Sequence, residues 1–411
     1  MAGCLNSELF CSLISPHSPD VFFAEIFEQR PMYFKGNLPS AQRSHLLSWE
    51  YLDEVLLRCL SLGCPESSEL VIYKNLAPCE DYTSPAEAYL QGASLIINNV
   101  DQLWRPVHTF CRALKFPSVY ANCYVTPQFS QTAPPHADDR DVLVLQLEGE
   151  KHWSIYSSPV YLPYPSEQVG KDHLEVPCEV LDSQNTRMLQ TLRAGDVLYV
   201  PRGFVHEAKT SSLSSLHLTV AIPTFDWSKS KVMIDALQDH IDGPAEAKKN
   251  PWRQSIPFYA PWNEVDLKAA LHQAVEELDI SKAKKIFEAK NHMHNHRQAL
   301  ALQAAESLRL PRRALRSSST VVWHQNGRLE GDLWLASSER ISLEYLLQTL
   351  EKGRPIEVGH IFGEAMRAKK RRAPLLEDQH DDGATSHNLP MLCGFLQICF
   401  AALCIENGLA T

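Results

Sequence analysis

The chain has 411 residues, of which 44% are hydrophobic and 21% are charged, and its formal net charge is −10. This length suggests two or three domains, and the acidic balance argues against a protein that coats nucleic acid through bulk positive charge. The 11 cysteines have irregular spacings without a CxxC pair. This pattern favours reduced thiols in the cytosol or nucleus over a disulfide framework.

The first part of the chain mixes helices and loops. Its N-terminal residues lack the basic start and the long apolar run of a signal peptide, so we expect no secretory leader. Helices are predicted at residues 20–29, 49–59 and 104–114, and a short strand is predicted at 94–100.

The following hundred residues are rich in predicted strands. Short apolar segments alternate with turns that contain glycine or proline, which is typical of a mainly β fold. The predicted strands are 118–126, 136–148, 152–156, 188–192, 196–200 and 215–222. They predict a double-stranded β-helix, the jelly-roll or cupin architecture, whose barrel offers inward-facing positions for a metal near its mouth.

A helical region follows the predicted barrel. Residues 264–308 have a helical composition, with Asn263 as the expected N-cap. An apolar stripe runs along this segment and consists of Leu267, Leu271, Ala274, Val275 and Leu278. Such a stripe must be buried, either on the chain's own barrel or on a second subunit.

The last hundred residues predict a small helix-plus-hairpin domain. A hairpin is expected around Asn326-Gly327, and Ser342 is the expected N-cap of a helix that ends near residue 350. Units of this kind are typical of winged helices. We therefore expect three regions: a β core with an N-terminal helical extension, a helical region and a winged-helix-like domain. Their expected bounds are 1–228, 229–310 and 311–411.

Two short segments near the C-terminus have more than one interpretation. The basic run 368–372 is either a nuclear localisation patch or a solvated basic turn. Residues 391–405 are almost wholly apolar but fall short of the roughly 20 residues that a membrane-spanning helix needs. A buried terminal helix is favoured over a tail anchor, and we expect no membrane association.

The most informative motif is a candidate metal-ligand set. His136 and Asp138 are two residues apart, so on a strand their side chains would point to the same side. His206 follows a Gly-Asp turn, a short apolar strand and a Pro-Arg-Gly turn. Two histidines and one carboxylate suit non-haem Fe(II) with open coordination positions, although zinc also accepts this set. Taken singly, each residue is more often structural.

Four other side chains are candidates for the same site. Lys151 lies just after the Gly149-Glu150 turn and offers a cation for the distal carboxylate of a dicarboxylate co-substrate, although a solvated strand-end lysine is the common case. Asn122 and Tyr124 share one face of a strand. For such a pair without further context, a functional role and a packing role are about equally expected. His217 shares a face with Thr219 and either lines the pocket or packs there.

A histidine-rich run in the helical region is not a strong metal candidate. His292 and His296 are i,i+4 neighbours on a helix, whereas His294 points elsewhere. No partner carboxylate is evident, so this run is expected to be a solvated helix face.

Several stretches together resemble the JmjC ribosomal oxygenases, in particular the Myc-induced nuclear antigen type. The resemblance is carried by the His136-Ala-Asp138 motif and by the runs 145–153 (LQLEGEKHW), 195–206 (GDVLYVPRGFVH) and 216–219 (LHLT). The N-terminal residues 12–16, 22–23 and 28–31 also look like that family. The later regions match it only in order and general character.

The resemblance implies a 2-oxoglutarate-dependent oxygenase that uses Fe(II) and O₂ to hydroxylate a histidine of a ribosomal protein. It places Lys151 and Tyr124 at the 2-oxoglutarate site. It further implies a homodimer formed through the middle helices, and nuclear, nucleolar residence. Ala137 stands where close relatives carry Tyr, a change that should leave iron binding intact. Ala221 stands where a small hydroxyl residue is expected near the pocket, which puts the choice of substrate in question more than catalysis.

Two alternatives remain open at this point. The same ligands would serve N-methyl-lysine demethylation, for example of a histone, because only the substrate groove separates the two reactions. A catalytically silent scaffold that uses the winged-helix-like region for protein or nucleic-acid contacts is the second alternative.

Overall fold

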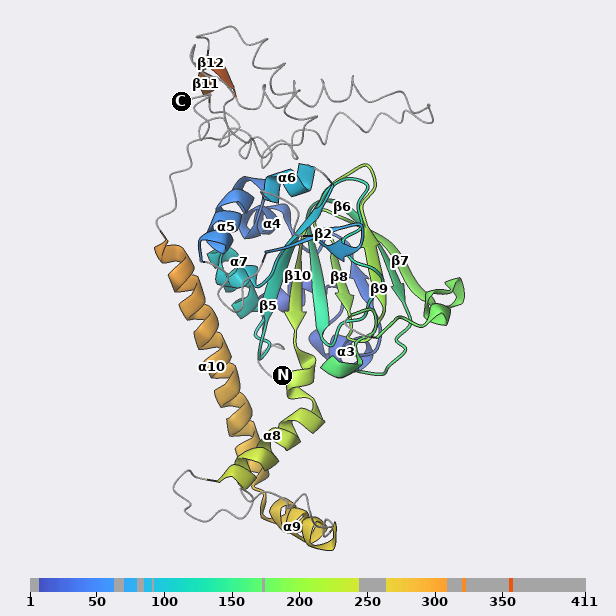
Figure 1. Ribbon diagram of the computed structural model, residues 1–411, viewed down its shortest axis with the longest axis vertical. Coiled ribbons are helices and arrows are strands. Elements are labelled where there is room, and N and C mark those ends of the chain that lie inside the picture. Colours follow the sequence, from blue (N-terminus) through green and yellow to red (C-terminus); the bar gives the residue numbers. More distant parts are fainter. Residues whose placement is uncertain are drawn as a thin grey trace.

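The computed structural model describes residues 7–62, 70–79, 85–90, 92–171, 174–243, 264–308, 320–322 and 355–357. A curved β core carries the N-terminal helices against one side, α8 and α9 extend away from it, and α10 runs back alongside it (Figure 1). The helices are α2 (Glu8–Leu13), α3 (Pro19–Glu25), α4 (Ser40–Leu46), α5 (Trp49–Ser61), α6 (Pro85–Leu90), α7 (Arg105–Ala113), α8 (Lys229–Asp242), α9 (Glu264–Glu277) and α10 (Ile280–Ser307).

The strands of the core pair in an antiparallel order that differs from their order in the sequence. They are β1 (Met32–Phe34), β2 (Leu70–Lys74), β3 (Ala77–Pro78), β4 (Ser94–Ile97), β5 (Tyr120–Thr126), β6 (Asp141–Tyr156), β7 (Thr186–Arg193), β8 (Val197–Val200), β9 (His206–Lys209) and β10 (Ser215–Ile222). The spatial order is β1-β8-β6-β10-β5-β4-β2-β3, and β7 and β9 also pair with β6.

The long strand β6 belongs to both sides of the barrel. Its first half pairs with β8 and β10, and its second half pairs with β7 and β9. The change occurs at Gly149, which has φ +68° and no room for a Cβ because the Ser214 carbonyl group occupies that space. The strand therefore bends from one sheet into the other, and the predicted double-stranded β-helix is confirmed.

One part of the strand prediction is wrong. The predicted strands 136–148 and 152–156 are a single strand, and that strand begins only at Asp141. His136 forms an isolated bridge with His206, and Asp138 lies in irregular backbone. Two prolines directly before His136 lack the N–H groups that a strand ladder needs, so regular pairing starts after the motif.

An aromatic cluster fixes the N-terminal helices to the barrel. Phe10 makes edge contacts with Phe22 and Phe116 at centroid distances of 5.3 and 5.2 Å, and Phe22 reaches Tyr199 of β8 at 5.0 Å. These rings are almost fully buried, and burial of each phenylalanine contributes roughly 2–3 kcal/mol. The N-terminal segment is therefore part of the core and closes one side of the barrel.

The later helices differ from the prediction in one respect. The segment 264–308 is two helices: α9 ends at Glu277, and Asp279 is the N-cap of α10. The Asp279 carboxylate accepts a hydrogen bond from the Ser281 amide at 2.9 Å. Gln298 of α10 donates a buried hydrogen bond to the Val119 carbonyl oxygen at 2.9 Å, which attaches this helix to the barrel. The expectation of Asn263 as a cap lies outside the described residues.

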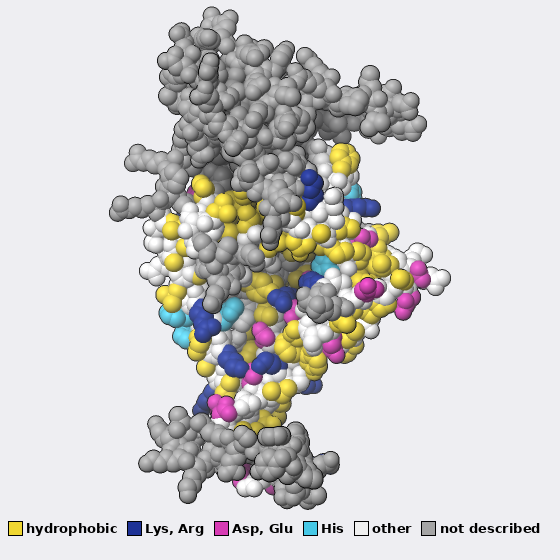
Figure 2. Space-filling view, viewed as in Figure 1, with side chains coloured by type: hydrophobic (Ala, Val, Ile, Leu, Met, Phe, Trp, Pro, Cys, Tyr) yellow, Lys and Arg dark blue, Asp and Glu magenta, His cyan; other side chains and the backbone are white. Residues whose placement is uncertain are grey.

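The apolar stripe of α9 is not buried on the barrel. Ala274 is buried, but the side chains of Leu267, Leu271 and Val275 are between 38% and 52% exposed. The alternative of burial on a second subunit stays a prediction. Basic and acidic side chains lie close together in the lower part of the described surface in Figure 2. Between α10 and α8, Lys290 pairs with Asp235 at 2.5 Å.

Little of the C-terminal region falls within the described residues. The strands β11 (Thr320–Val322) and β12 (Pro355–Glu357) pair antiparallel. The expected hairpin at Asn326-Gly327, the helix from Ser342, the basic run 368–372 and the apolar segment 391–405 lie outside the described residues, so the winged-helix prediction stays a prediction. Within the described part of the chain, no helix has both the length and the apolarity needed to cross a bilayer.

Candidate metal centre

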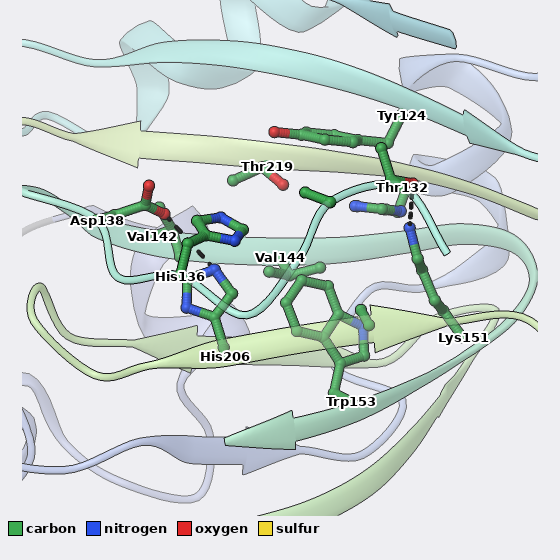
Figure 3. A pocket seen from close by; sticks show the side chains of 13 residues that line it. Tyr124, Thr132, His136, Asp138, Val142, Val144, Lys151, Trp153, His206 and Thr219 are labelled. Carbon is green, nitrogen blue, oxygen red and sulfur yellow. Dashed lines mark hydrogen bonds and ion pairs between the residues drawn. The ribbon is translucent and has the colours of Figure 1, made fainter. Parts of the chain in front are cut away.

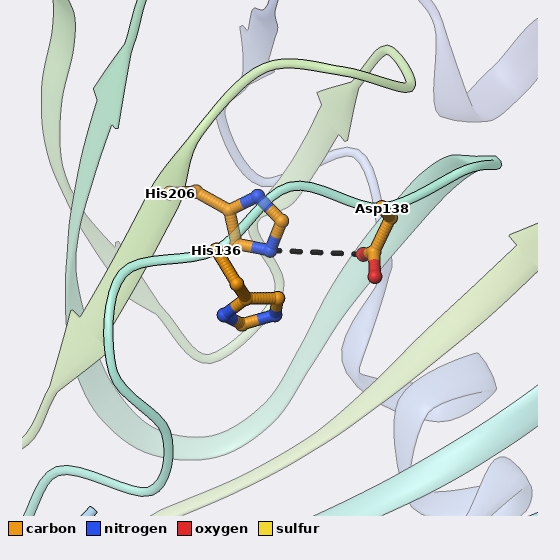
Figure 4. Close-up of side chains that lie close together, drawn as sticks. All are labelled: His136, Asp138 and His206. Carbon is orange, nitrogen blue, oxygen red and sulfur yellow. Dashed lines mark ion pairs between the residues drawn. The ribbon is translucent and has the colours of Figure 1, made fainter. Parts of the chain in front are cut away.

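Three side chains that are distant in sequence converge at one end of the barrel. His136, Asp138 and His206 each offer a ligand atom, and these atoms all lie within 4.8 Å of one another (Figure 4). The imidazole centroids of the two histidines are 4.5 Å apart, and His206 Nε2 lies 3.7 Å from Asp138 Oδ2. No other group of this kind occurs in the portion of the chain that the structure describes.

The backbone holds the two ligand segments together. The amide of His136 donates to the carbonyl oxygen of His206 at 3.1 Å, and the reverse hydrogen bond is 2.8 Å long. Gly203, in the turn before β9, donates to the carbonyl oxygen of Asp138 at 2.8 Å. A Cβ on Gly203 would lie 2.6 Å from the Ser158 hydroxyl, so only glycine fits this turn.

Hydrogen bonds set the imidazoles for metal binding. Nδ1 of His136 lies 2.8 Å from the Pro134 carbonyl oxygen, and Nδ1 of His206 lies 3.0 Å from that of Phe204. Because each Nδ1–H donates to a carbonyl, each Nε2 keeps a lone pair for a metal. Burial lowers the pKa of His136 to about 3, and the nearby His206 adds to this effect. Burial likewise lowers the pKa of His206.

The carboxylate of the set is held in its ionised form. Burial by itself would raise the pKa of Asp138, but the Lys171 ammonium and the two imidazoles outweigh it and hold this pKa well below its usual value. Neutral imidazoles and one carboxylate are the donors that Fe(II) or another divalent metal needs, so the three residues fit a metal ion chemically.

A buried lysine lies at the far end of the same pocket (Figure 3). Lys151 is only 2% exposed, and its Nζ donates to the hydroxyls of Thr126 at 3.0 Å and Thr132 at 3.5 Å. Among the described residues, no carboxylate pairs with this ammonium group. Burial lowers the pKa of Lys151 to about 7. A buried cation without a carboxylate partner fits the binding of an anionic ligand.

Aromatic side chains form the wall between the lysine and the ligand set. The Tyr124 ring stacks on His217 at 4.8 Å with an interplanar angle of 6°, and Lys151 Nζ lies 5.8 Å from the Tyr124 ring centre. Burial raises the pKa of Tyr124, so its hydroxyl stays a neutral donor, and burial lowers the pKa of His217 well below its usual value. His217 and Thr219 both line the pocket, as their shared face predicts.

The fourth candidate, Asn122, lies outside this inner pocket. Its Oδ1 accepts a hydrogen bond from the Asn99 amide at 2.9 Å, and the residue lines an adjoining groove of about 510 Å³. Part of the groove lining is apolar and comes from β2, the turn after it, β3 and β4; its members are Val71, Tyr73, Leu76, Pro78 and Ile96. His136, Asp138 and Lys171 also line this groove.

The sequence reasoning missed three side chains at the site. Thr126 follows Asn122 and Tyr124 at the same two-residue spacing, so strand alternation carried a signal for it. Thr132 and Lys171 lie in loops and carried no such signal. The histidine run of α10 agrees with its prediction, because His292 and His296 are exposed.

A double-stranded β-helix with two histidines and one carboxylate converging at one end defines the class of cupin-type metal-site proteins. Residues 97–229 match the family model described as "JmjC domain". Over this part of the chain, the resemblance to the JmjC ribosomal oxygenases is confirmed by the family model and by two relatives.

Two curated relatives illustrate the similarity. The chain is 29% identical over 254 residues to "Ribosomal oxygenase 2" of Mus musculus, covering 58% of this chain and 51% of the relative. It is 32% identical over 230 residues to "Bifunctional lysine-specific demethylase and histidyl-hydroxylase NO66" of Drosophila simulans, covering 51% of this chain and 25% of the relative. The matched part thus spans about half or less of the length of these relatives.

One solved structure found by comparison is YcfD, described as "a Ribosomal oxygenase from Escherichia coli in complex with Cobalt and 2-oxoglutarate". It shares 14% sequence identity, with coverage of 96% of this chain and 97% of YcfD and a TM-score of 0.42.

Proposed function

We propose that this chain is an Fe(II)- and 2-oxoglutarate-dependent oxygenase that hydroxylates a histidine side chain of a ribosomal protein. The observation that carries the proposal is the shared pocket, which has His136, Asp138 and His206 at one end and the buried ammonium of Lys151 at the other. This arrangement suits a co-substrate that has a chelating keto-acid end and a second carboxylate.

The residues of the chain have separate tasks in this reaction. His136, Asp138 and His206 would hold the iron, and bound iron would supply the reaction of O₂ with 2-oxoglutarate that gives succinate and CO₂. Lys151 would bind the distal carboxylate, with Tyr124 as a further donor, and this ion pair would replace the hydroxyl contacts that the ammonium group makes to Thr126 and Thr132.

The pocket wall would keep water away from the reacting groups. Val142, Val144 and Trp153 line it between the two ends, and all three side chains are buried. Trp153 lies 5.9 Å from the His206 ring and 5.8 Å from the His217 ring, so it fills the space beside the ligand set. A dry wall strengthens the pairing between Lys151 and a carboxylate.

The groove beside the ligand set would bind the substrate. His136 and Asp138 line it, and Asn122 offers a hydrogen-bonding group to a polar side chain that enters it. The names of the relatives support a ribosomal protein as the substrate. The printed name of the Drosophila relative also contains a lysine demethylase activity, so removal of a methyl group from lysine, for example in a histone, is the second candidate.

Mass spectrometry of peptide products tests this proposal. The purified chain, Fe(II), ascorbate and 2-oxoglutarate are incubated with histidine-containing ribosomal peptides and with methyl-lysine histone peptides. One oxygen gained on a histidine, lost in Asp138→Ala, supports the proposal, whereas a methyl group lost from lysine supports the second candidate. If neither product nor succinate forms in any peptide mixture, the chain is a binding scaffold and the proposal is wrong.

We also propose a homodimer and nuclear, nucleolar residence. The exposed apolar side chains of α9 support a second subunit as the partner of the region 229–310. Light scattering of the full chain would show a dimer that Leu271→Glu converts to a monomer. A fluorescent fusion would report the compartment, and a diffuse cytoplasmic signal would contradict the localisation. The proposed domain bounds are 1–228, 229–310 and 311–411.

A further inference from the structure

Lys171 contacts a candidate metal ligand directly. Its Nζ forms an ion pair with Oδ1 of Asp138, while the other carboxylate oxygen, Oδ2, faces His206 at 3.7 Å. The two oxygens of Asp138 therefore have different neighbours: one lies against an ammonium group and the other against the imidazoles. Lys171 also lines the groove beside the ligand set.

The backbone around Lys171 is fitted to the ligand segment. The amide of Ala137 donates to the Val169 carbonyl oxygen at 2.9 Å, which pairs the two segments. A Cβ on Gly170, which has φ +76°, would lie 2.6 Å from Cα of His136, so the backbones approach as closely as glycine allows. The amide of Gly170 donates to the Leu174 carbonyl oxygen at 2.6 Å. These contacts fix the position from which the lysine reaches Asp138.

We infer, on the basis of the proposed function, that Lys171 is a positioning residue that orients the Asp138 carboxylate so that Oδ2 is the metal-binding oxygen. Without this contact the carboxylate is free to rotate away from the metal, so the metal loses a fixed ligand and 2-oxoglutarate loses a well-formed site. The ammonium group holds Oδ1 and leaves Oδ2 toward the imidazoles. Groups that hydrogen-bond to ligating side chains in this way commonly contribute a factor of about 10–100 to metal affinity or activity.

A simple charge effect makes the opposite prediction. A cation next to a divalent metal repels it, so the loss of Lys171 would strengthen metal binding if charge were its only effect. If Lys171 positions Asp138, its loss weakens metal binding and also weakens 2-oxoglutarate binding to the metal-loaded protein. The sign of the change therefore separates the two explanations.

Calorimetric titration of the full chain with Co(II), and then of the Co(II)-loaded protein with 2-oxoglutarate, tests the inference. The variants are Lys171→Met, Lys171→Gln and Lys171→Arg. Lys209→Met is the matched control, because Lys209 lies on β9 with an exposed side chain. Thermal unfolding of each variant establishes that the fold is kept.

The expected result is Co(II) binding weakened about 10–100-fold by Lys171→Met and Lys171→Gln, with at least partial recovery in Lys171→Arg and no change in the control. If the wild type binds Co(II) and both neutral variants bind it equally or more tightly, the role of Lys171 is overturned and the proposed metal centre is kept. Absence of Co(II) binding by the wild type would instead overturn the proposed metal centre and, with it, this inference.

Discussion

Replacing Lys151 by methionine is expected to stabilise the protein while removing its affinity for 2-oxoglutarate. Lys151 is 2% exposed, and among the described residues its ammonium group donates hydrogen bonds to two hydroxyls, those of Thr126 and Thr132. Burial lowers its pKa from 10.5 to about 7, and each pKa unit corresponds to about 1.4 kcal/mol, which gives an upper bound of about 5 kcal/mol at neutral pH. The lost hydroxyl contacts cost about 1 kcal/mol each, so a net gain of about 2–4 kcal/mol is expected.

The pH dependence of this gain follows from proton linkage. Because the pKa of Lys151 is depressed on folding, the unfolded chain binds more protons than the folded one between pH 7 and 10.5. The wild type therefore becomes more stable as pH rises through this window. The advantage of Lys151→Met is largest near pH 6–7 and disappears as pH approaches 10.5.

Urea denaturation at pH 7, with and without Mn(II) and 2-oxoglutarate, measures both effects. Wild type gains stability from the ligand by mass action. Lys151→Met loses about 2–5 kcal/mol of binding free energy, or roughly 30-fold or more in affinity, so it gains little. Lys209→Met is the control and follows the wild type. A less stable Lys151→Met, or one that still gains as much from 2-oxoglutarate as wild type, would refute the reasoning.

Three further predictions concern the backbone and the protonation of the site. Gly149→Ala is expected to lower the unfolding free energy by about 3 kcal/mol or more, because its Cβ would meet the Ser214 carbonyl group. The control Gly36→Ala has a similar φ of +70° and open space, and it is expected to cost about 1 kcal/mol. Equal costs in urea denaturation would contradict this prediction. Leu76→Gly is expected to raise stability by about 1 kcal/mol, because Leu76 has φ +68° in the two-residue turn between β2 and β3; a loss would show that its groove contacts outweigh the strain. At pH 8, 2-oxoglutarate binding is expected to take up close to one proton, because Lys151, with a pKa of about 7, is mostly neutral before it pairs with a carboxylate; calorimetry in buffers of different ionisation enthalpy would show no uptake if Lys151 stays neutral.

The ligand set was predictable because its signal lies in residue type and in short-range turns. Two histidines, one aspartate and the Pro-Arg-Gly turn before His206 carry the chemistry without reference to the rest of the fold. The local backbone at His136 was not predicted correctly, since Pro134 and Pro135 interrupt the ladder that the apolar pattern of β6 suggests. The side chains still converge because the isolated bridge between His136 and His206 replaces a regular strand.

Contacts made by loops were beyond the reach of sequence periodicity. Lys171 reaches Asp138 across 33 positions, through a segment that has neither helical nor strand periodicity. Thr132 reaches Lys151 from the loop between β5 and β6. Similarly, the break between α9 and α10 depends on one capping residue, Asp279, within a composition that is helical throughout.

The central claim is that three side chains hold a metal on one face while Lys151 holds the far end of the co-substrate. A crystal structure of the full chain, grown without oxygen in the presence of Fe(II) and 2-oxoglutarate, tests it most directly. We expect iron bonded to His136, His206 and a single oxygen of Asp138, with the keto acid chelating it and the distal carboxylate against Lys151. Iron bound elsewhere, a fourth protein ligand, or a distal carboxylate that points away from Lys151 would contradict the claim.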